Sequence, residues 1–220
     1  MGLVSLIREP SVASERPPLL VLLHGIGADE LDLLDVAQAL DPRLRAASLR
    51  GPQETEPMGY AWYALDWRSM PPTPDLAQAE RSREEVAATL EEIASRTGAD
   101  PGSTFLFGFS QGATMALAVA LTRPELARGV ILHSGRMLQG LERRVAPPGR
   151  LARLEALVLH GVHDDVLPVE RGREMRDALV PILGPRLEYR EHEAGHFVTP
   201  DSIADAARWL SARIRGPGEG

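Results

Sequence analysis

The chain alternates short apolar runs with longer amphipathic stretches. The apolar runs predict strands over residues 19–25, 46–51, 104–109, 129–135, 156–161 and 187–195. The amphipathic stretches, in which apolar residues recur three and four positions apart, predict helices over residues 31–40, 75–98, 112–124, 169–183 and 202–214. Strands that alternate with helices in this way are typical of a mostly parallel central sheet with helices on both faces, so the sequence predicts an α/β fold.

Residues 1–220 are predicted to form a single domain, because no repeat or linker divides the chain. Residues 1–9 are expected to add an edge strand, and the tail at 215–220 is expected to fray. The connection between Gly135 and Ala156 is too short for an inserted lid domain. Residues 52–74, rich in proline and aromatic side chains, are predicted to form a long irregular connection.

Composition removes several classes of chemistry. The chain has no cysteine, which excludes disulfides, thiolate nucleophiles and cysteine metal sites, and it has no lysine, which excludes Schiff-base chemistry. A net charge of −7 argues against a nucleic-acid or anionic-membrane partner. The N-terminus lacks a secretory signal pattern and no apolar run reaches the length of a membrane span, so a cytoplasmic protein without stable membrane insertion is expected.

Ser110 is the first candidate for chemistry. It is the central residue of Gly108-Phe109-Ser110-Gln111-Gly112, which fits the pattern G-x-S-x-G between a predicted strand and a predicted helix. This is the setting of a nucleophile elbow, in which flanking glycines leave room for a tight turn and the serine lies at a helix N-terminus. A helix-start serine between two glycines is the alternative interpretation.

A serine nucleophile needs a base and an acid, which in such a fold follow it at later strand ends. We expect His196 as the base, because it follows the last predicted strand, whereas His192 falls inside that strand. The acid is expected in "HGVHDD", where spacing alone does not choose between Asp164 and Asp165. Zinc is not expected at the histidines of this loop, because the chain lacks a ligand set at metal spacing.

An oxyanion hole is also required for acyl transfer. The glycine-rich loop "HGIG" follows the strand at 19–25, and from it we expect the backbone N–H of Ile26 to contribute. The second donor is expected to be the backbone N–H of Gln111, the residue after the nucleophile. His24 is expected to shape this loop.

Several segments together, "LLHGIGADELDLLDVAQAL", "GYAWYALDW", "GFSQGATMALAVAL", "HGVHDDVLP" and "EAGHFV", resemble the phospholipase/carboxylesterase family of α/β-hydrolases. The resemblance runs from about residue 17 to residue 212 and implies an open α/β-hydrolase fold with a Ser-Asp-His triad and no lid domain. The family's acid stands in an "HGxxD" pattern, which implies Asp164. Asp165 replaces the proline that commonly follows this acid, a departure from the family pattern.

The resemblance implies a serine carboxylic-ester hydrolase that works through an acyl-enzyme, without cofactor or metal, on small-molecule esters. Short-to-medium acyl esters are expected, with thioesters and lysophospholipids as further substrates and a homodimer as a further expectation. The alternatives are a lactone or amide hydrolase that uses the same triad, or a non-catalytic binding protein of the same fold. The aromatic residues of the 52–74 connection are expected to line the substrate pocket: Tyr60, Trp62, Tyr63 and Trp67.

Overall fold

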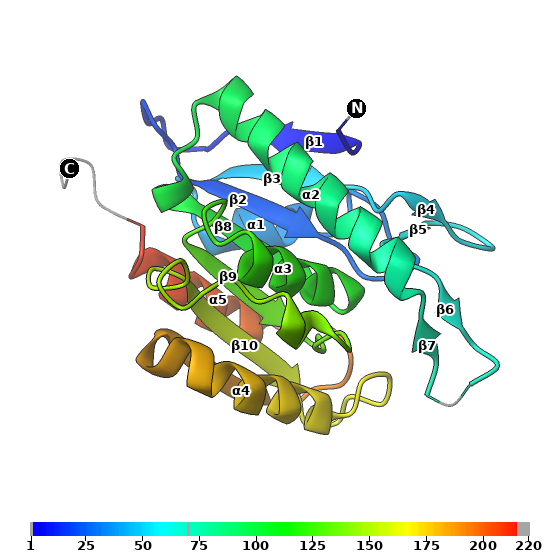
Figure 1. Ribbon diagram of the computed structural model, residues 1–220. Helices are drawn as coiled ribbons and strands as arrows, with labels where there is room; N and C mark the ends of the chain where they lie inside the picture. Colours follow the sequence, from blue (N-terminus) through cyan, green and yellow to red (C-terminus); the bar gives the residue numbers. More distant parts are fainter. Residues whose placement is uncertain (1, 70, 215–220) are drawn as a thin grey trace.

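The protein is built around one seven-stranded sheet (Figure 1). The computed structural model describes residues 2–69 and 71–214. In chain order, the strands of the sheet are β1 (Ser5–Arg8), β2 (Leu19–Leu23), β3 (Arg45–Leu49), β8 (Thr104–Phe109), β9 (Gly129–His133), β10 (Glu155–Gly161) and β11 (Leu187–His192). Their spatial order is β1-β3-β2-β8-β9-β10-β11, and every pairing is parallel except that of β1 with β3.

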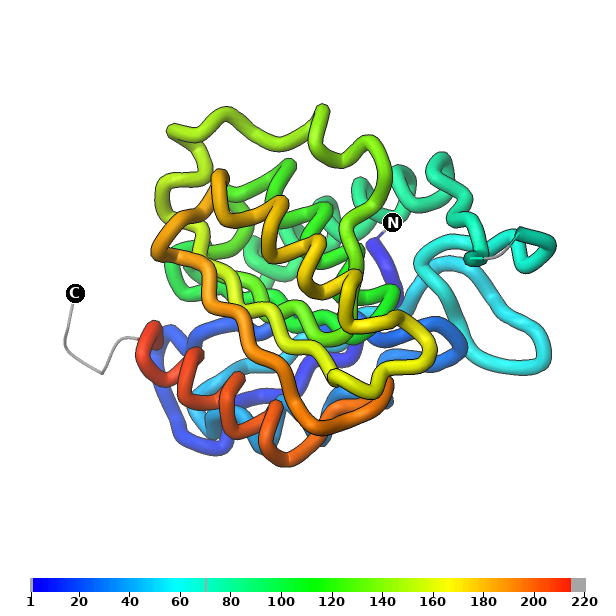
Figure 2. The backbone as a smooth tube through the Cα atoms, turned by 90° about the horizontal axis from the view of Figure 1, so that it is seen from below, coloured from blue at the N-terminus to red at the C-terminus, as the bar shows by residue number. Residues whose placement is uncertain are grey.

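Helices cover both faces of the sheet, as the tube in Figure 2 shows. One face carries α2 (Leu76–Thr97), α3 (Gln111–Thr122) and α4 (Val169–Leu183), and the other carries α1 (Leu34–Leu40) and α5 (Pro200–Ser211). Successive residues of a strand point to opposite faces, so β2 sends Val21 and Leu23 into one core and Leu20 and Leu22 into the other. This arrangement confirms the predicted α/β fold without an inserted lid.

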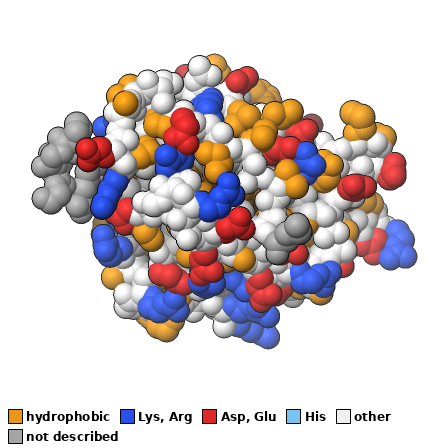
Figure 3. Space-filling model, turned by 90° about the horizontal axis from the view of Figure 1, so that it is seen from above, with side chains coloured by type: hydrophobic (Ala, Val, Ile, Leu, Met, Phe, Trp, Pro, Cys, Tyr) orange, Lys and Arg blue, Asp and Glu red, His pale blue; other side chains and the backbone are white. Residues whose placement is uncertain are grey.

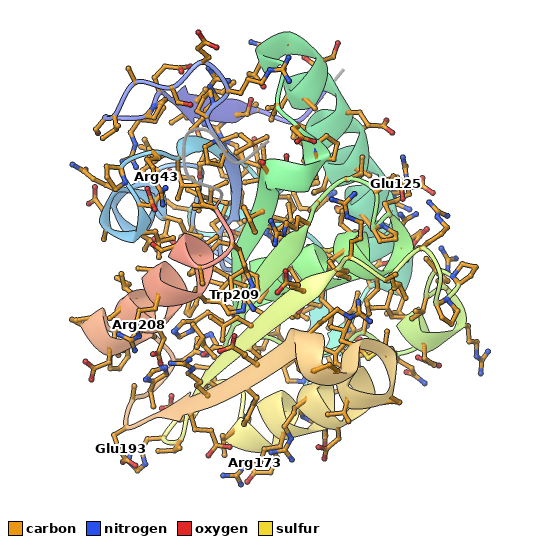
Figure 4. All side chains as sticks on the ribbon, turned by 90° about the vertical axis from the view of Figure 1, so that its left-hand side faces the viewer. Arg43, Glu125, Arg173, Glu193, Arg208 and Trp209 are labelled. Atoms are coloured by element: carbon orange, nitrogen blue, oxygen red, sulfur yellow. The ribbon has the colours of Figure 1, made fainter. Side chains whose placement is uncertain are left out.

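Helix α5 shows the expected division between a buried and an exposed face, whereas α3 is buried over nearly its whole length. On α5, Trp209 is 2% exposed and points toward the sheet, whereas the adjacent Arg208 points away from it (Figure 4). The helix begins at Pro200 behind a Thr199 capping box, two residues before the predicted start. Helix α1 begins at Leu34 rather than at residue 31, because Asp29 accepts a hydrogen bond from the Leu31 amide and holds a turn there.

The connection at 52–74 is more ordered than the sequence predicts. Two short hairpins form here, β4 (Gln53–Glu54) with β5 (Tyr60–Ala61), and β6 (Leu65–Asp66) with β7 (Thr73–Pro74). They project beyond the carboxyl ends of the strands on the right of Figure 1. The prediction of an irregular segment was wrong at these residues, because each strand has only two residues and leaves no period-two pattern to detect.

Charged side chains of both signs are interspersed over the face shown in Figure 3. They form no large patch of one sign on that face, which agrees with the modest net charge. Within residues 2–69 and 71–214, no helix has both the length and the apolar character to cross a membrane.

Candidate active site

Ser110 lies in a sharp turn between β8 and α3. Its φ of 53° and ψ of −116° fall in a region that non-glycine residues rarely adopt, so the surrounding structure must hold the turn. A Cβ on Gly112 would collide with the backbone oxygen of Leu23, and one on Gly108 would collide with the backbone of Gly112 and Ala113. The glycines of G-x-S-x-G are therefore required by close backbone approach on either side of Ser110.

His196 connects Ser110 with Asp164 through both of its ring nitrogens. Its Nε2 lies 2.8 Å from the Ser110 Oγ, and its Nδ1 lies 2.6 Å from the Asp164 Oδ2. The carboxylate requires a proton on Nδ1, so the neutral ring accepts the Ser110 hydroxyl proton at Nε2. The Phe109 ring, at 5.0 Å between centroids, packs against the imidazole. Three residues from three strand ends thus form one hydrogen-bonded series.

Asp164 is fixed by its own loop. Its Oδ1 accepts hydrogen bonds from the backbone amides of Val166, at 3.0 Å, and Leu167, at 2.7 Å, and its side chain is fully buried. His160 donates to the Leu167 carbonyl oxygen at 2.8 Å and so connects the two ends of the loop. Asp165 is exposed to solvent and makes no hydrogen bond to His196. The geometry therefore distinguishes two adjacent carboxylates that spacing alone did not.

The rival histidine takes no part in this series. His192 is the last residue of β11, and its Nε2 lies 3.4 Å from the Asp205 Oδ2 on α5. His163 is exposed and pairs with Glu193 at 2.9 Å. Within the described residues, no group of three histidine, aspartate or glutamate side chains has the geometry of a metal site.

The loop after β2 lies against the nucleophile. A Cβ built on Gly25 would stand 3.5 Å from the Cβ of Ser110, which places the next residue, Ile26, beside the elbow. The Gly27 amide donates to the Tyr60 carbonyl at 2.8 Å, whereas the Ile26 amide has no hydrogen-bond acceptor within the described part of the chain. The Gln111 amide lies in the first turn of α3, where helical N–H groups lack intrahelical partners. Both donors expected for an oxyanion are therefore available.

The side chain of His24 fixes the conformation of this loop through two hydrogen bonds to backbone groups. Its Nδ1 donates to the Gly25 carbonyl at 2.6 Å, and its Nε2 accepts from the Gly51 amide at 2.9 Å. Burial lowers the pKa of the His24 imidazole, and the acceptor role at Nε2 requires the neutral form. The carbonyl of His24 accepts from the Trp62 indole N–H at 2.8 Å. The ring is thus a structural group that ties the loop to its neighbours.

The four aromatic residues expected in the pocket take different places. Trp62 is fully buried in the core, and Tyr60 packs its ring under the guanidinium of Arg50 at 4.5 Å. Tyr63 and Trp67 border a cavity of about 700 Å³ next to Ile26, whereas Tyr60 and Trp62 are not among its lining residues. Trp67 is 66% exposed at the rim of this cavity. Tyr63, by contrast, is 1% exposed, so of these four side chains only that of Trp67 faces a space that a substrate could enter.

One contact of the site escaped the sequence analysis. The side chain of Gln111, for which the sequence predicted a role only through its backbone N–H, accepts from the Trp62 amide at 2.7 Å and donates to the Tyr63 carbonyl at 2.7 Å. Gln111 is 5% exposed. A polar residue at the start of a helix that is otherwise buried throughout could have signalled such a role, because buried amides need partners.

Comparison with known proteins agrees with this geometry. A family model described as Phospholipase/Carboxylesterase matches residues 7–214. A probable carboxylesterase of Oryza sativa subsp. japonica is 24% identical over 155 residues, 67% of this chain and 66% of the relative. The chain spans two thirds or less of the length of the first curated relatives it matches.

Solved structures share the fold. Esterase PE8 has a TM-score of 0.82 and 28% identity, with 98% of this chain and 100% of that chain covered. The Bacillus cereus carboxylesterase has a TM-score of 0.80 at 22% identity, with 96% and 94% covered. The chain belongs to the phospholipase/carboxylesterase family of α/β-hydrolases.

Proposed function

We propose that the protein hydrolyses carboxylic esters through an acyl-enzyme on Ser110. The observation that carries this proposal is the continuous hydrogen-bonded series from Ser110 through His196 to Asp164. In it His196 accepts the serine proton as the Oγ attacks the ester carbonyl, and Asp164 stabilises the resulting imidazolium. The alcohol leaves with the proton from His196, and water then repeats the attack on the acyl-enzyme.

The backbone N–H groups of Ile26 and Gln111 are proposed to hold the oxyanion that forms at each attack. Such donors act most strongly where they are oriented before the reaction begins. His24 contributes this orientation for the Ile26 loop, and the start of α3 contributes it for Gln111. Every proton in this sequence moves between groups of the chain, the substrate and water, so the proposal needs no cofactor.

Short-to-medium acyl esters are the proposed substrates, because the cavity bordered by Ile26 and Trp67 is open and largely apolar. A thioester or a lysophospholipid would use the same attack. A cytoplasmic location and a homodimer stay predictions from the sequence.

The test is labelling by a fluorophosphonate probe, followed by mass spectrometry of the modified peptide. We expect one adduct, on Ser110, and its loss in Ser110→Ala. The same variant should hydrolyse para-nitrophenyl acetate on the order of a million-fold more slowly than the wild type, on the scale of other triads. An unlabelled wild-type protein without esterase activity would favour a binding protein, and turnover equal to wild type in Ser110→Ala would refute the mechanism.

A further inference from the structure

Arg136 lies against the first turn of α3, the helix that begins after the proposed nucleophile, but has no part in the mechanism above. It follows β9 by three residues, at the same sheet edge as Ser110 and Asp164. Its backbone amide donates to the Thr114 hydroxyl at 3.3 Å, and that hydroxyl lies 3.3 Å from the Ser110 carbonyl oxygen. The backbone of Arg136 is therefore linked to the turn of Ser110 through one intermediate residue, Thr114.

The charge of Arg136 is not matched by an acidic side chain. Within residues 2–69 and 71–214, no carboxylate oxygen lies within 4.0 Å of its guanidinium, although Arg136 is partly buried. Its polar neighbour is the neutral phenol of Tyr63: burial raises the pKa of that phenol, and the nearby Arg136 charge opposes the rise. A partly buried cation without a counter-charge is costly, which favours an anion that arrives with a ligand.

Comparison with the other described arginines shows that a partly buried guanidinium without a carboxylate or carbonyl partner is unusual in this chain. Most described arginines pair with a carboxylate or donate to a carbonyl, as Arg171 does to Glu174 at 2.8 Å. Apart from Arg136, the described arginines that do neither are exposed, so water can solvate their charges: Arg16, Arg81 and Arg153. Arg136 alone among the described arginines combines partial burial with the lack of such a partner.

Arg136 also lines a cavity that could receive an anion. This cavity of about 280 Å³ lies between residues 71–74, the loop after β9 and the start of α4. Its walls combine the apolar Met137, Leu138 and Met175 with the polar Thr73 and Gln139. Glu174 is the one carboxylate in its lining and is already paired with Arg171, which also lines the cavity. The cavity thus offers one positive charge, that of Arg136, without a counter-charge.

We propose that Arg136 binds a carboxylate group of the substrate, so that the enzyme prefers esters that carry a carboxylate away from the scissile bond. This inference rests on the proposed esterase function. A guanidinium matches a carboxylate with two parallel hydrogen bonds, which sets orientation as well as affinity. The net charge of −7 does not attract anions from a distance, so the preference comes from this local contact.

Two matched pairs of esters test the inference and show which side of the ester carries the carboxylate. On the acyl side, mono-para-nitrophenyl glutarate is compared with para-nitrophenyl pentanoate, which has the same chain length but ends in a methyl group. On the alcohol side, meta-carboxyphenyl butanoate is compared with phenyl butanoate. For Arg136→Gln we expect the anionic-to-neutral ratio of kcat/KM to fall by about tenfold or more in at least one pair, mainly through KM.

Two further variants separate a specific contact from a loss of folding or of net charge. Arg136→Lys keeps the positive charge but lacks the planar guanidinium, and it should recover part of the anionic-to-neutral ratio of kcat/KM. Arg153→Gln removes an exposed, unpaired charge elsewhere and should leave both ratios at the wild-type value. Equal ratios in Arg136→Gln and wild type, for both pairs, would overturn the inference alone. A wild-type enzyme that hydrolyses none of the four esters would instead overturn the proposed function on which it rests.

Discussion

Gln111 holds Trp62 through a buried hydrogen bond of 2.7 Å from the Trp62 amide to the Gln111 Oε1. The Gln111 Nε2 donates to the carbonyl of Tyr63, so one side chain satisfies two backbone groups of the 52–74 connection. The same residue contributes the proposed oxyanion N–H through its own backbone. The 52–74 connection and the turn of Ser110 are therefore joined at one residue, Gln111.

We expect Gln111→Ala to destabilise the fold by roughly 2–6 kcal/mol, because two buried backbone groups lose their partners at about 1–3 kcal/mol each. Urea unfolding measures this loss. Gln78→Ala is the matched control: its Oε1 accepts from the Ala64 amide at 2.8 Å in the same segment, but at an exposed position, so water can replace it. Equal losses in the two variants would contradict a role that depends on burial.

The sequence predicted the sheet, its helices, Ser110 and His196 from strong patterns, whereas the choice of Asp164 over Asp165 came from the family resemblance. Buried strands, amphipathic helices and G-x-S-x-G are local signals that survive in a single chain. The partners of the Gln111 side chain and the unmatched Arg136 were not predicted, because they depend on which distant segments meet in space. Residues 49 positions apart, such as Trp62 and Gln111, leave no joint pattern in one sequence. The two hairpins are local but were missed because strands of two residues are too short for a period-two pattern.

The two adjacent aspartates should differ sharply in their effect on catalysis. Asp164→Asn leaves an amide where His196 Nδ1–H needs a carboxylate, so we expect kcat to fall on the order of 10⁴-fold, as in other triads with the wrong tautomer. Asp165→Asn should change kcat by less than about threefold, because its side chain is exposed. Steady-state hydrolysis of para-nitrophenyl acetate measures both, and a larger loss at Asp165 would reassign the acid.

The two tryptophans of the 52–74 connection should separate stability from substrate preference. Trp62→Ala removes a fully buried ring and its hydrogen bond to His24, and should destabilise the protein by about 3–5 kcal/mol. Trp67→Ala should leave the free energy of unfolding within about 0.5 kcal/mol, because that side chain is 66% exposed.

We expect Trp67→Ala to raise KM more for octanoate than for acetate esters, since the ring borders the cavity beside Ile26. A panel of para-nitrophenyl esters of increasing chain length measures this. An identical KM shift at every chain length would remove Trp67 from the acyl-binding surface.

Gly112 should tolerate no side chain. A Cβ at this position would collide with the backbone oxygen of Leu23, and a strand backbone cannot move aside as the end of a flexible side chain can. We expect Gly112→Ala to cost about 1–3 kcal/mol or more in thermal or urea unfolding, and to lower kcat as the elbow shifts. Gly149→Ala, at a position with no atom within 4 Å of the built Cβ, is the control and should unfold like the wild type.

His133 should make the fold sensitive to acid. Burial is the main cause that lowers the pKa of this imidazole to about 3, and the neutral ring bonds to the Ser202 hydroxyl at 3.0 Å. In the unfolded chain the same imidazole has a pKa of about 6.5. Between these values the unfolded chain binds the proton more readily than the folded one, so the free energy of unfolding decreases as pH falls from about 6.5 toward 3.

Replacing His133 removes this contribution and isolates it from the carboxylates. Glu191, whose pKa its partner Arg173 lowers to about 2, loses its own stabilisation with falling pH in both proteins, so it cancels in the comparison. We expect His133→Gln to show a shallower decline in urea-unfolding free energy than the wild type between pH 6.5 and pH 4. Parallel declines would mean that the buried imidazole of His133 is not held neutral, and that the acid sensitivity of the fold comes from other groups, such as His24 and the carboxylates.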